Sequence, residues 1–145
     1  MAKTITSEIK FLVELDENRV PEKLTWTAQD GGVEAEEAKA MMLSIWDNKA
    51  QETLRIDLWT KDMPVDEMKL FFHQTLVAMS DTFRRATDDE KMADTMKDFC
   101  DYFAEKLELN KLNRNRIEYI IVTKIYKTKV EIGSIERNKC IGAWK

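Results

Sequence analysis

The clearest chemical pattern in the chain is a row of four carboxylates at helical spacing: Asp94, Asp98, Asp101 and Glu105. At about 100° per residue they share one side of a predicted helix. Like charges at i,i+4 cost about 0.2–0.5 kcal/mol each in an isolated helix, so the row is either a solvated outer face or a surface that attracts a basic partner. A straight helix does not wrap a divalent cation as a binding loop does, and we predict no metal site here.

A tryptophan ends a short predicted strand and is the second candidate for binding. In residues 54–59, Leu54, Ile56 and Leu58 alternate with more polar residues that lead to Trp59. This period of two is typical of a half-buried strand, and it places Trp59 on the face opposite the leucines. If that face is open, Trp59 would anchor a protein interface. The alternative is that strands of the C-terminal segment cover it.

The remaining reactive side chains favour structural roles. His73 is the only histidine, and a zinc site would need further His or Cys ligands at fixed spacing. Cys100 is predicted to be a buried small hydrophobe, and Cys140 to be exposed and incidental. The chain has no nucleophile elbow, phosphate-binding loop or dinucleotide fingerprint. We therefore predict no catalytic residue, no cofactor and no metal.

Composition indicates a soluble globular protein in a reducing compartment. The chain has 145 residues, of which 43% are hydrophobic and 34% charged, so we expect one core domain. No apolar run approaches the roughly 18 residues that a membrane span needs. Charged residues interrupt the apolar residues at the N-terminus, which argues against a secretory signal. Two cysteines are too few for a disulfide framework, and the predicted location is the cytoplasm.

The charge is distributed unevenly along the chain. Residues 1–109 carry 14 Lys and Arg against 24 Asp and Glu, a net charge of −10. Residues 110–145 carry nine against three, a net charge of +6. An acidic body repels nucleic acid phosphates, so no nucleic acid partner is expected. The basic segment could bind an acidic surface, including that of its own body.

Periodicity predicts an α+β domain in residues 1–109 with the order ββαβαα. We expect a hairpin over 9–28, a helix over 34–46 and the strand over 54–59. Two helices follow, divided by a capping box in which Thr87 precedes Glu90 by three residues. The three strands would form one antiparallel sheet, with all three helices on one face. Residues 110–145 would form a basic, strand-like extension.

The helix that begins after Pro64 carries two apolar stripes. The main stripe contains Val65, Met68, Phe72, Leu76, Met79 and Phe83. A narrower stripe beside it contains Leu70, His73 and Val77. A long helix in a layered fold often touches two elements, so this second stripe would pack against the next helix or make a contact with a partner.

Several stretches resemble the gliding motility protein GldC family of Bacteroidetes. They are SEIKF, VPEKLTW, DGGVEAEEAKAMMLSIWD, LRIDLWTKDMPVDEMKLFFHQTL and RATDDEKMADTMKDFCDYFAEKL, which together span roughly residues 7–107. Members of that family usually end near the position of Leu107, whereas this chain continues. The resemblance implies a small cytoplasmic protein associated with gliding motility and type IX secretion, and it transfers no catalytic residues.

These observations predict a non-enzymatic accessory protein that binds other proteins of the motility and secretion machinery, through Trp59 and the carboxylate row. One alternative is a ligand-binding or enzymatic domain with a cleft between sheet and helices near His73, Arg55 and Asp57. Another is a holdase-like chaperone that uses exposed methionine and aromatic side chains. The sequence leaves the partner's identity and the oligomeric state open.

Overall fold

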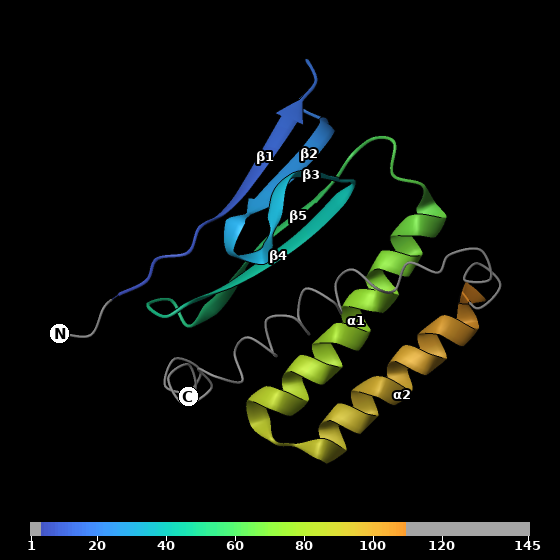
Figure 1. Ribbon diagram of the computed structural model, residues 1–145. Helices are drawn as coiled ribbons and strands as arrows, with labels where there is room; N and C mark the ends of the chain where they lie inside the picture. Colours follow the sequence, from blue (N-terminus) through green and yellow to red (C-terminus); the bar gives the residue numbers. More distant parts are fainter. Residues whose placement is uncertain (1–3, 110–145) are drawn as a thin grey trace. The chain divides into compact units, whose positions relative to one another are not determined.

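The computed structural model describes residues 4–109, and Figure 1 shows their strands and helices. The chain divides into two compact units, Met1–Pro64 and Val65–Lys145. In the described residues, the first unit, here called the sheet unit, contains five strands and one short 3₁₀ turn, and the second, the helical unit, contains two helices. The predicted extension over 110–145 lies outside the described residues, so the boundary at residue 109 stays a prediction.

A three-stranded antiparallel sheet forms the first half of the sheet unit. Its strands are β1 (Ile9–Leu15), β2 (Pro21–Ala28) and β3 (Val33–Ala38), in the order β1-β2-β3. Val13, Leu24 and Ala38 are register partners across the three strands. The 3₁₀ turn η1 (Gln29–Gly31) and Gly32, whose φ is +69°, connect β2 to β3. Glycine suits that left-handed position because it has no Cβ to clash.

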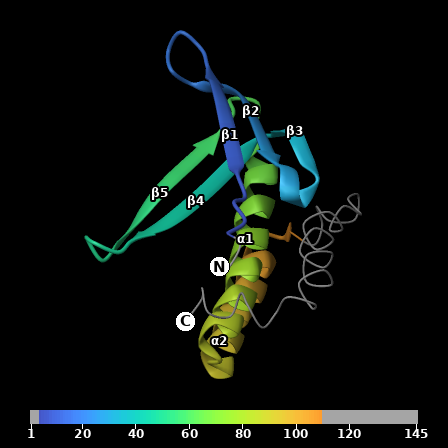
Figure 2. The same ribbon diagram turned by 60° about the vertical axis from the view of Figure 1, so that its left-hand side comes forward.

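A second, two-stranded sheet follows, made of β4 (Ala40–Asp47) and β5 (Glu52–Trp59). Lys39 alone separates β3 from β4, so one stretch of chain leaves the first sheet and enters the second. Figure 2 shows β3 and β4 on either side of this bend. The Thr60 N–H donates to the Lys39 carbonyl across 2.7 Å, which holds the end of β5 against the bend.

The predicted helix over 34–46 is wrong, because these residues form β3 and most of β4. Ala, Glu, Met and Leu are good helix formers, which is why the stretch resembled a helix. The same residues also alternate, however, and Met41, Leu43 and Ile45 pair with Leu58, Ile56 and Leu54 of β5. Pairing with a distant strand overrides local propensity here. Over residues 4–109 the order is therefore five strands followed by two helices, not ββαβαα, and this part of the chain has two helices, not three.

The predicted sheet and the predicted strand over 54–59 are both present, but the strand is not part of that sheet. The three-stranded antiparallel sheet is confirmed, but its third strand is β3. The predicted strand over 54–59 is present as part of β5, and it pairs with β4 instead. The packing of helices on one sheet face stays a prediction.

The helical unit is a hairpin of α1 (Val65–Thr87) and α2 (Glu90–Lys106). Pro64 precedes α1, and Asp66 and Glu67 lie in its first turn, where the helix dipole favours negative charge. The helices are divided where the sequence predicted, but the capping residue is Asp89, whose carboxylate accepts from the Met92 N–H at 3.0 Å. Neither helix is long and apolar enough to cross a membrane.

Asp16 and Asp47 organise two of the turns of the sheet unit, between β1 and β2 and between β4 and β5. The Asp16 carboxylate accepts the N–H groups of Asn18 and Val20, at 2.8 and 2.9 Å. The Asp47 carboxylate accepts those of Lys49 and Ala50, at 2.8 and 3.0 Å. Backbone donors favour the ionised form, so they hold the pKa of both carboxyls below the ordinary value.

We expect acid to weaken the sheet unit through these turns. The Asp16 pKa is lowered from 3.8 chiefly by the Val20 N–H. Its contribution to stability is therefore complete above that value and is lost as pH falls through the lower folded pKa. Melting temperatures followed by tryptophan fluorescence between about pH 5 and pH 2 should fall less steeply for Asp16→Asn than for the wild type. A variant of the adjacent exposed carboxylate, Glu17→Gln, should keep the wild-type slope; equal slopes in all three would contradict the assignment.

Candidate protein-binding surfaces

Two tryptophans lie on the same face of the β4–β5 hairpin. Register pairs Ala40 with Trp59 and Trp46 with Thr53, and side chains two residues apart share a face. Trp46 and Trp59 are 59% and 57% exposed, near opposite ends of the hairpin. We call this surface the Trp face; its residues are Ala40, Met42, Ser44 and Trp46 of β4 and Thr53, Arg55, Asp57 and Trp59 of β5.

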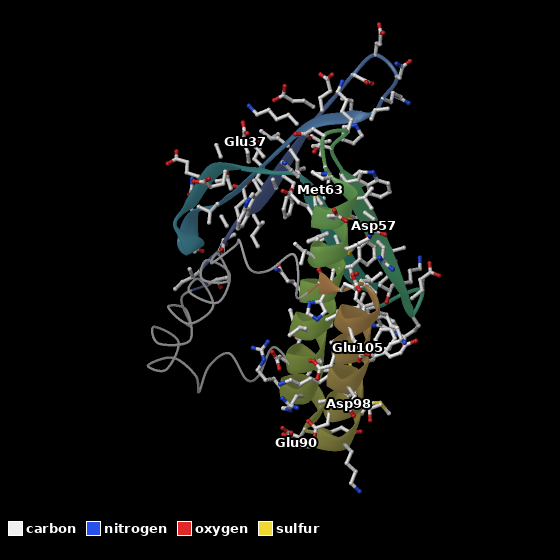
Figure 3. The ribbon with its side chains drawn as sticks, turned by 90° about the vertical axis from the view of Figure 1, so that its right-hand side faces the viewer. Glu37, Asp57, Met63, Glu90, Asp98 and Glu105 are labelled. Atoms are coloured by element: carbon white, nitrogen blue, oxygen red, sulfur yellow. The ribbon has the colours of Figure 1, made fainter. Side chains whose placement is uncertain are left out.

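The charges between the two tryptophans neutralise each other. Arg55 Nη2 lies 3.0 Å from both carboxylate oxygens of Asp57, two residues along β5. Both side chains are partly exposed, so this ion pair adds little to stability. It leaves the centre of the Trp face polar but uncharged overall. Figure 3 shows Asp57 on β5.

Backbone hydrogen bonds connect the chain at and just after Trp59 to two other strands, β4 and β2. Trp59 pairs with Ala40, and the next residue, Thr60, is 3% exposed. The Thr60 hydroxyl bonds Asp62 at 2.5 Å, and the following N–H, of Lys61, donates to the Pro21 carbonyl at 3.1 Å. An exposed tryptophan on a fixed backbone has little backbone entropy to lose on binding. Trp59 is thus exposed among residues 4–109, as one of the two alternatives stated, and the other alternative, cover by the C-terminal segment, lies outside the described residues. The bonds that hold its backbone are not revealed by the pattern of one strand.

The second stripe of α1 contacts α2, as one of the two predicted alternatives stated. The His73 ring stacks on Phe103, with 6.3 Å between ring centroids and 15° between ring planes. Ser80 of α1 and Ala93, Cys100 and Ala104 of α2 are buried. Small side chains along a helix contact allow close approach of the two axes. His73 thus has a packing partner, and burial raises the pKa of the Cys100 thiol.

The cleft proposed near His73, Arg55 and Asp57 gains no support from these residues. Arg55 and Asp57 are on the exposed hairpin of the sheet unit and pair with each other. His73 belongs to the helical unit and packs on a phenylalanine. Within residues 4–109 there is also no group of three or more His, Cys, Asp or Glu side chains able to hold a metal ion.

The carboxylate row is only partly free. Asp94 lies 2.6 Å from Arg84 Nη2, near the tight connection between α1 and α2. Arg84 Nε is also 2.8 Å from Glu90, though its N–H is not directed at that oxygen, and Asp81 is 3.6 Å from Arg84. Asp94 therefore joins a cluster that ties the helices together, and it is a poor candidate for partner binding.

Asp98, Asp101 and Glu105 remain exposed along α2. Figure 3 shows Asp98 and Glu105 at successive levels of the helix, with Glu90 near its start. We call these three carboxylates the acidic surface; it is the part of the predicted carboxylate row that, among the described residues, makes no ion pair with Arg84. They belong to the helical unit, whereas Trp59 belongs to the sheet unit.

Two features were missed by the sequence prediction. Trp46 was assigned to a helix, and only its pairing in β4 places it on the Trp face. The exposure of part of the main stripe of α1 is the second: Phe72 and Met79 are 43% and 53% exposed. The small residues would identify the contact between α1 and α2. Ser80, Ala93 and Cys100 are buried there, and each directly follows an exposed apolar residue.

Comparison with known proteins supports the same family that the sequence stretches indicated. No curated protein and no solved structure matches the chain. The sequence profile described as "Gliding motility-associated protein GldC-like" matches residues 21–109, which include β2 to β5 and both helices. This match covers more than half of the 145 residues, and the chain therefore belongs to the GldC-like family of gliding motility-associated proteins.

Proposed function

We propose that this protein is a non-enzymatic, cytoplasmic accessory component of the gliding motility and type IX secretion machinery that acts by binding another protein through the Trp face. Membership of the GldC-like family supports involvement in gliding motility. The observation that carries the binding mode is the pair of half-exposed tryptophans, Trp46 and Trp59, on one face of a hairpin.

The chemistry of the Trp face suits a protein partner. Tryptophan supplies a large apolar surface and one N–H donor, and it is enriched among residues that dominate interface energetics. Arg55 and Asp57 between the tryptophans can be matched by polar groups of a partner without leaving an unpaired charge. The partner we expect therefore presents apolar pockets separated by a polar strip.

The test is quantitative affinity capture from the source cells with tagged full-length protein. Trp59→Ala should reduce recovery of the specific partner at least about tenfold, because removing an interface anchor commonly costs 2 kcal/mol or more. Trp46→Ala should act on the same partner. Leu54→Ala is the matched control, because Leu54 is 50% exposed on the opposite face of the same hairpin. Unchanged recovery with both tryptophan variants would refute the Trp face as the binding surface.

The acidic surface is tested in the same capture experiment. A triple variant, Asp98→Asn with Asp101→Asn and Glu105→Gln, removes three charges from α2 and keeps side chains of similar size. If these carboxylates steer a basic partner, recovery should fall and the loss should be greatest at low ionic strength. An unchanged set of partners would remove this surface from the proposal and leave the Trp face unaffected.

A further inference from the structure

The two helices of the hairpin share a pattern that divides their surface into two sides. Phe72 and Met79 directly precede the contact residues His73 and Ser80 in α1. In α2, Met92 and Phe99 directly precede the buried residues Ala93 and Cys100 in the same way. Each exposed apolar residue is thus displaced from the helix contact by about 100°, in the same rotational sense.

Equal displacement in the two antiparallel helices places all four side chains on one side of the hairpin. Stacking of His73 on Phe103 and pairing of Arg84 with Asp94 set the helices antiparallel. Because the chain runs in opposite directions, successive residues rotate clockwise in one helix and anticlockwise in the other when both are viewed from the same end. The two contact lines also face each other, so the residue before each contact residue lies on the same side of the hairpin in both helices. We call this surface the helical apolar side; it consists of Phe72, Met79, Met92 and Phe99, which are 43–53% exposed.

The residues that follow the contact line are polar or charged. Asp81 follows Ser80, Asp94 follows Ala93, Asp101 follows Cys100 and Glu105 follows Ala104. These carboxylates lie on the opposite side of the hairpin, by the same geometry. The charges that would repel a second acidic molecule are thus separated from the helical apolar side.

We propose that the helical apolar side binds the same side of a second copy of this chain, so that two hairpins form a four-helix bundle. Such an interface is isologous, with one surface paired to itself about a two-fold axis. Four-helix bundles are the common way for two helical hairpins to cover apolar sides. The free chain buries few large apolar side chains, since among residues 4–109 only Leu24, Val33 and Leu109 are large hydrophobics below 9% exposure.

The available area fits a modest dimer. Half-exposed aromatic and methionine side chains offer on the order of 100 Å² each. The four residues and the neighbouring Tyr102 then supply about 500 Å² per copy, or about 1,000 Å² for two, near the lower limit for a specific interface. The basic segment 110–145 is a poorer occupant, because its net charge of +6 complements the carboxylates on the other side.

Sedimentation velocity on the full chain over about 1–100 μM tests the proposal. We expect the wild type to reach twice its 17.0 kDa mass within this range. Phe72→Glu should raise the dimer dissociation constant at least about 30-fold, since it places a charge within the apolar contact. Gln74→Glu, two residues away in α1 and off the helical apolar side, should leave the dissociation constant unchanged. Circular dichroism of both variants checks that the helices are retained.

A second measurement requires no substitution on the interface. Oxidation of Met79 and Met92 by peroxide, followed by mass spectrometry, should slow as wild-type concentration rises, whereas oxidation of Met63 in the sheet unit should not change. A wild type that stays monomeric at 100 μM would overturn the proposal. So would a dimer that survives in Phe72→Glu with Met79 and Met92 unprotected, because that dimer would use another surface. Neither result bears on the Trp face.

Discussion

Leu24→Ala should lower the free energy of unfolding of the sheet unit by about 3 kcal/mol, the largest effect we expect from one substitution. Leu24 lies in the central strand β2, opposite Val13 and Ala38, and is 2% exposed. Truncating it removes three carbons and leaves a cavity that the paired backbones on both sides cannot close. Val33 is the other large apolar side chain of the described sheet unit with less than 9% exposure, so little remains to compensate.

Urea unfolding followed by tryptophan fluorescence measures this effect, because Trp26, Trp46 and Trp59 all belong to the sheet unit. Leu12→Ala is the matched control: Leu12 lies in β1 and is 53% exposed, so its truncation should cost less than about 1 kcal/mol. Equal losses for the two variants would show that Leu24 is not the centre of the core.

Ala93→Leu should lower the free energy of unfolding of the helical unit by about 2 kcal/mol. Ala93 is 0% exposed and follows the connection between α1 and α2 by a few residues. Leucine has almost the same helix propensity as alanine, so the cost arises from the added volume. The larger side chain would push the helices apart near Arg84, which pairs with Asp94.

Thermal unfolding followed by circular dichroism at the helical wavelength measures the loss. Ala86→Leu makes the same substitution at an exposed position of α1 and should change stability by less than about 0.5 kcal/mol. If Ala93→Leu were as stable as the wild type, the helix contact would not run through Ala93.

The elements that were predicted correctly are those whose signals are local. The hairpin of β1 and β2 alternates clearly, and α1 follows a proline and has acidic residues in its first turn. The prediction for residues 34–46 failed because their helix-forming composition competes with an alternation that matters only when the stretch pairs with β2 and β5. In the same way, a carboxylate such as Asp94 looks free until Arg84, ten residues earlier, is brought next to it by the turn.

The candidate binding residues show the same limit of prediction from local sequence patterns. Trp59 was identified because a single strand pattern predicts its face, whereas Trp46 reaches that face only through pairing. The contact with α2 involves the second stripe of α1, which has fewer large side chains than the main stripe. Small residues permit the two helices to pack closely, whereas Phe72 and Met79 are partly exposed to solvent. Sequence left open whether the second stripe packs on the next helix or on a partner, and the stacking of His73 on Phe103 selects the first alternative.

The turn at Asp47 keeps both tryptophans on one face of the hairpin. Because side chains alternate along a strand, sliding β4 past β5 by one residue would place Trp46 on the face that carries Leu54 and Ile56, opposite Trp59. The Asp47 carboxylate prevents such a slip by fixing the Lys49 and Ala50 amides, while the Gln51 N–H bonds the Asp47 carbonyl at 2.8 Å. The bonds of Asp47 thus fix the register that places Trp46 and Trp59 on the same face.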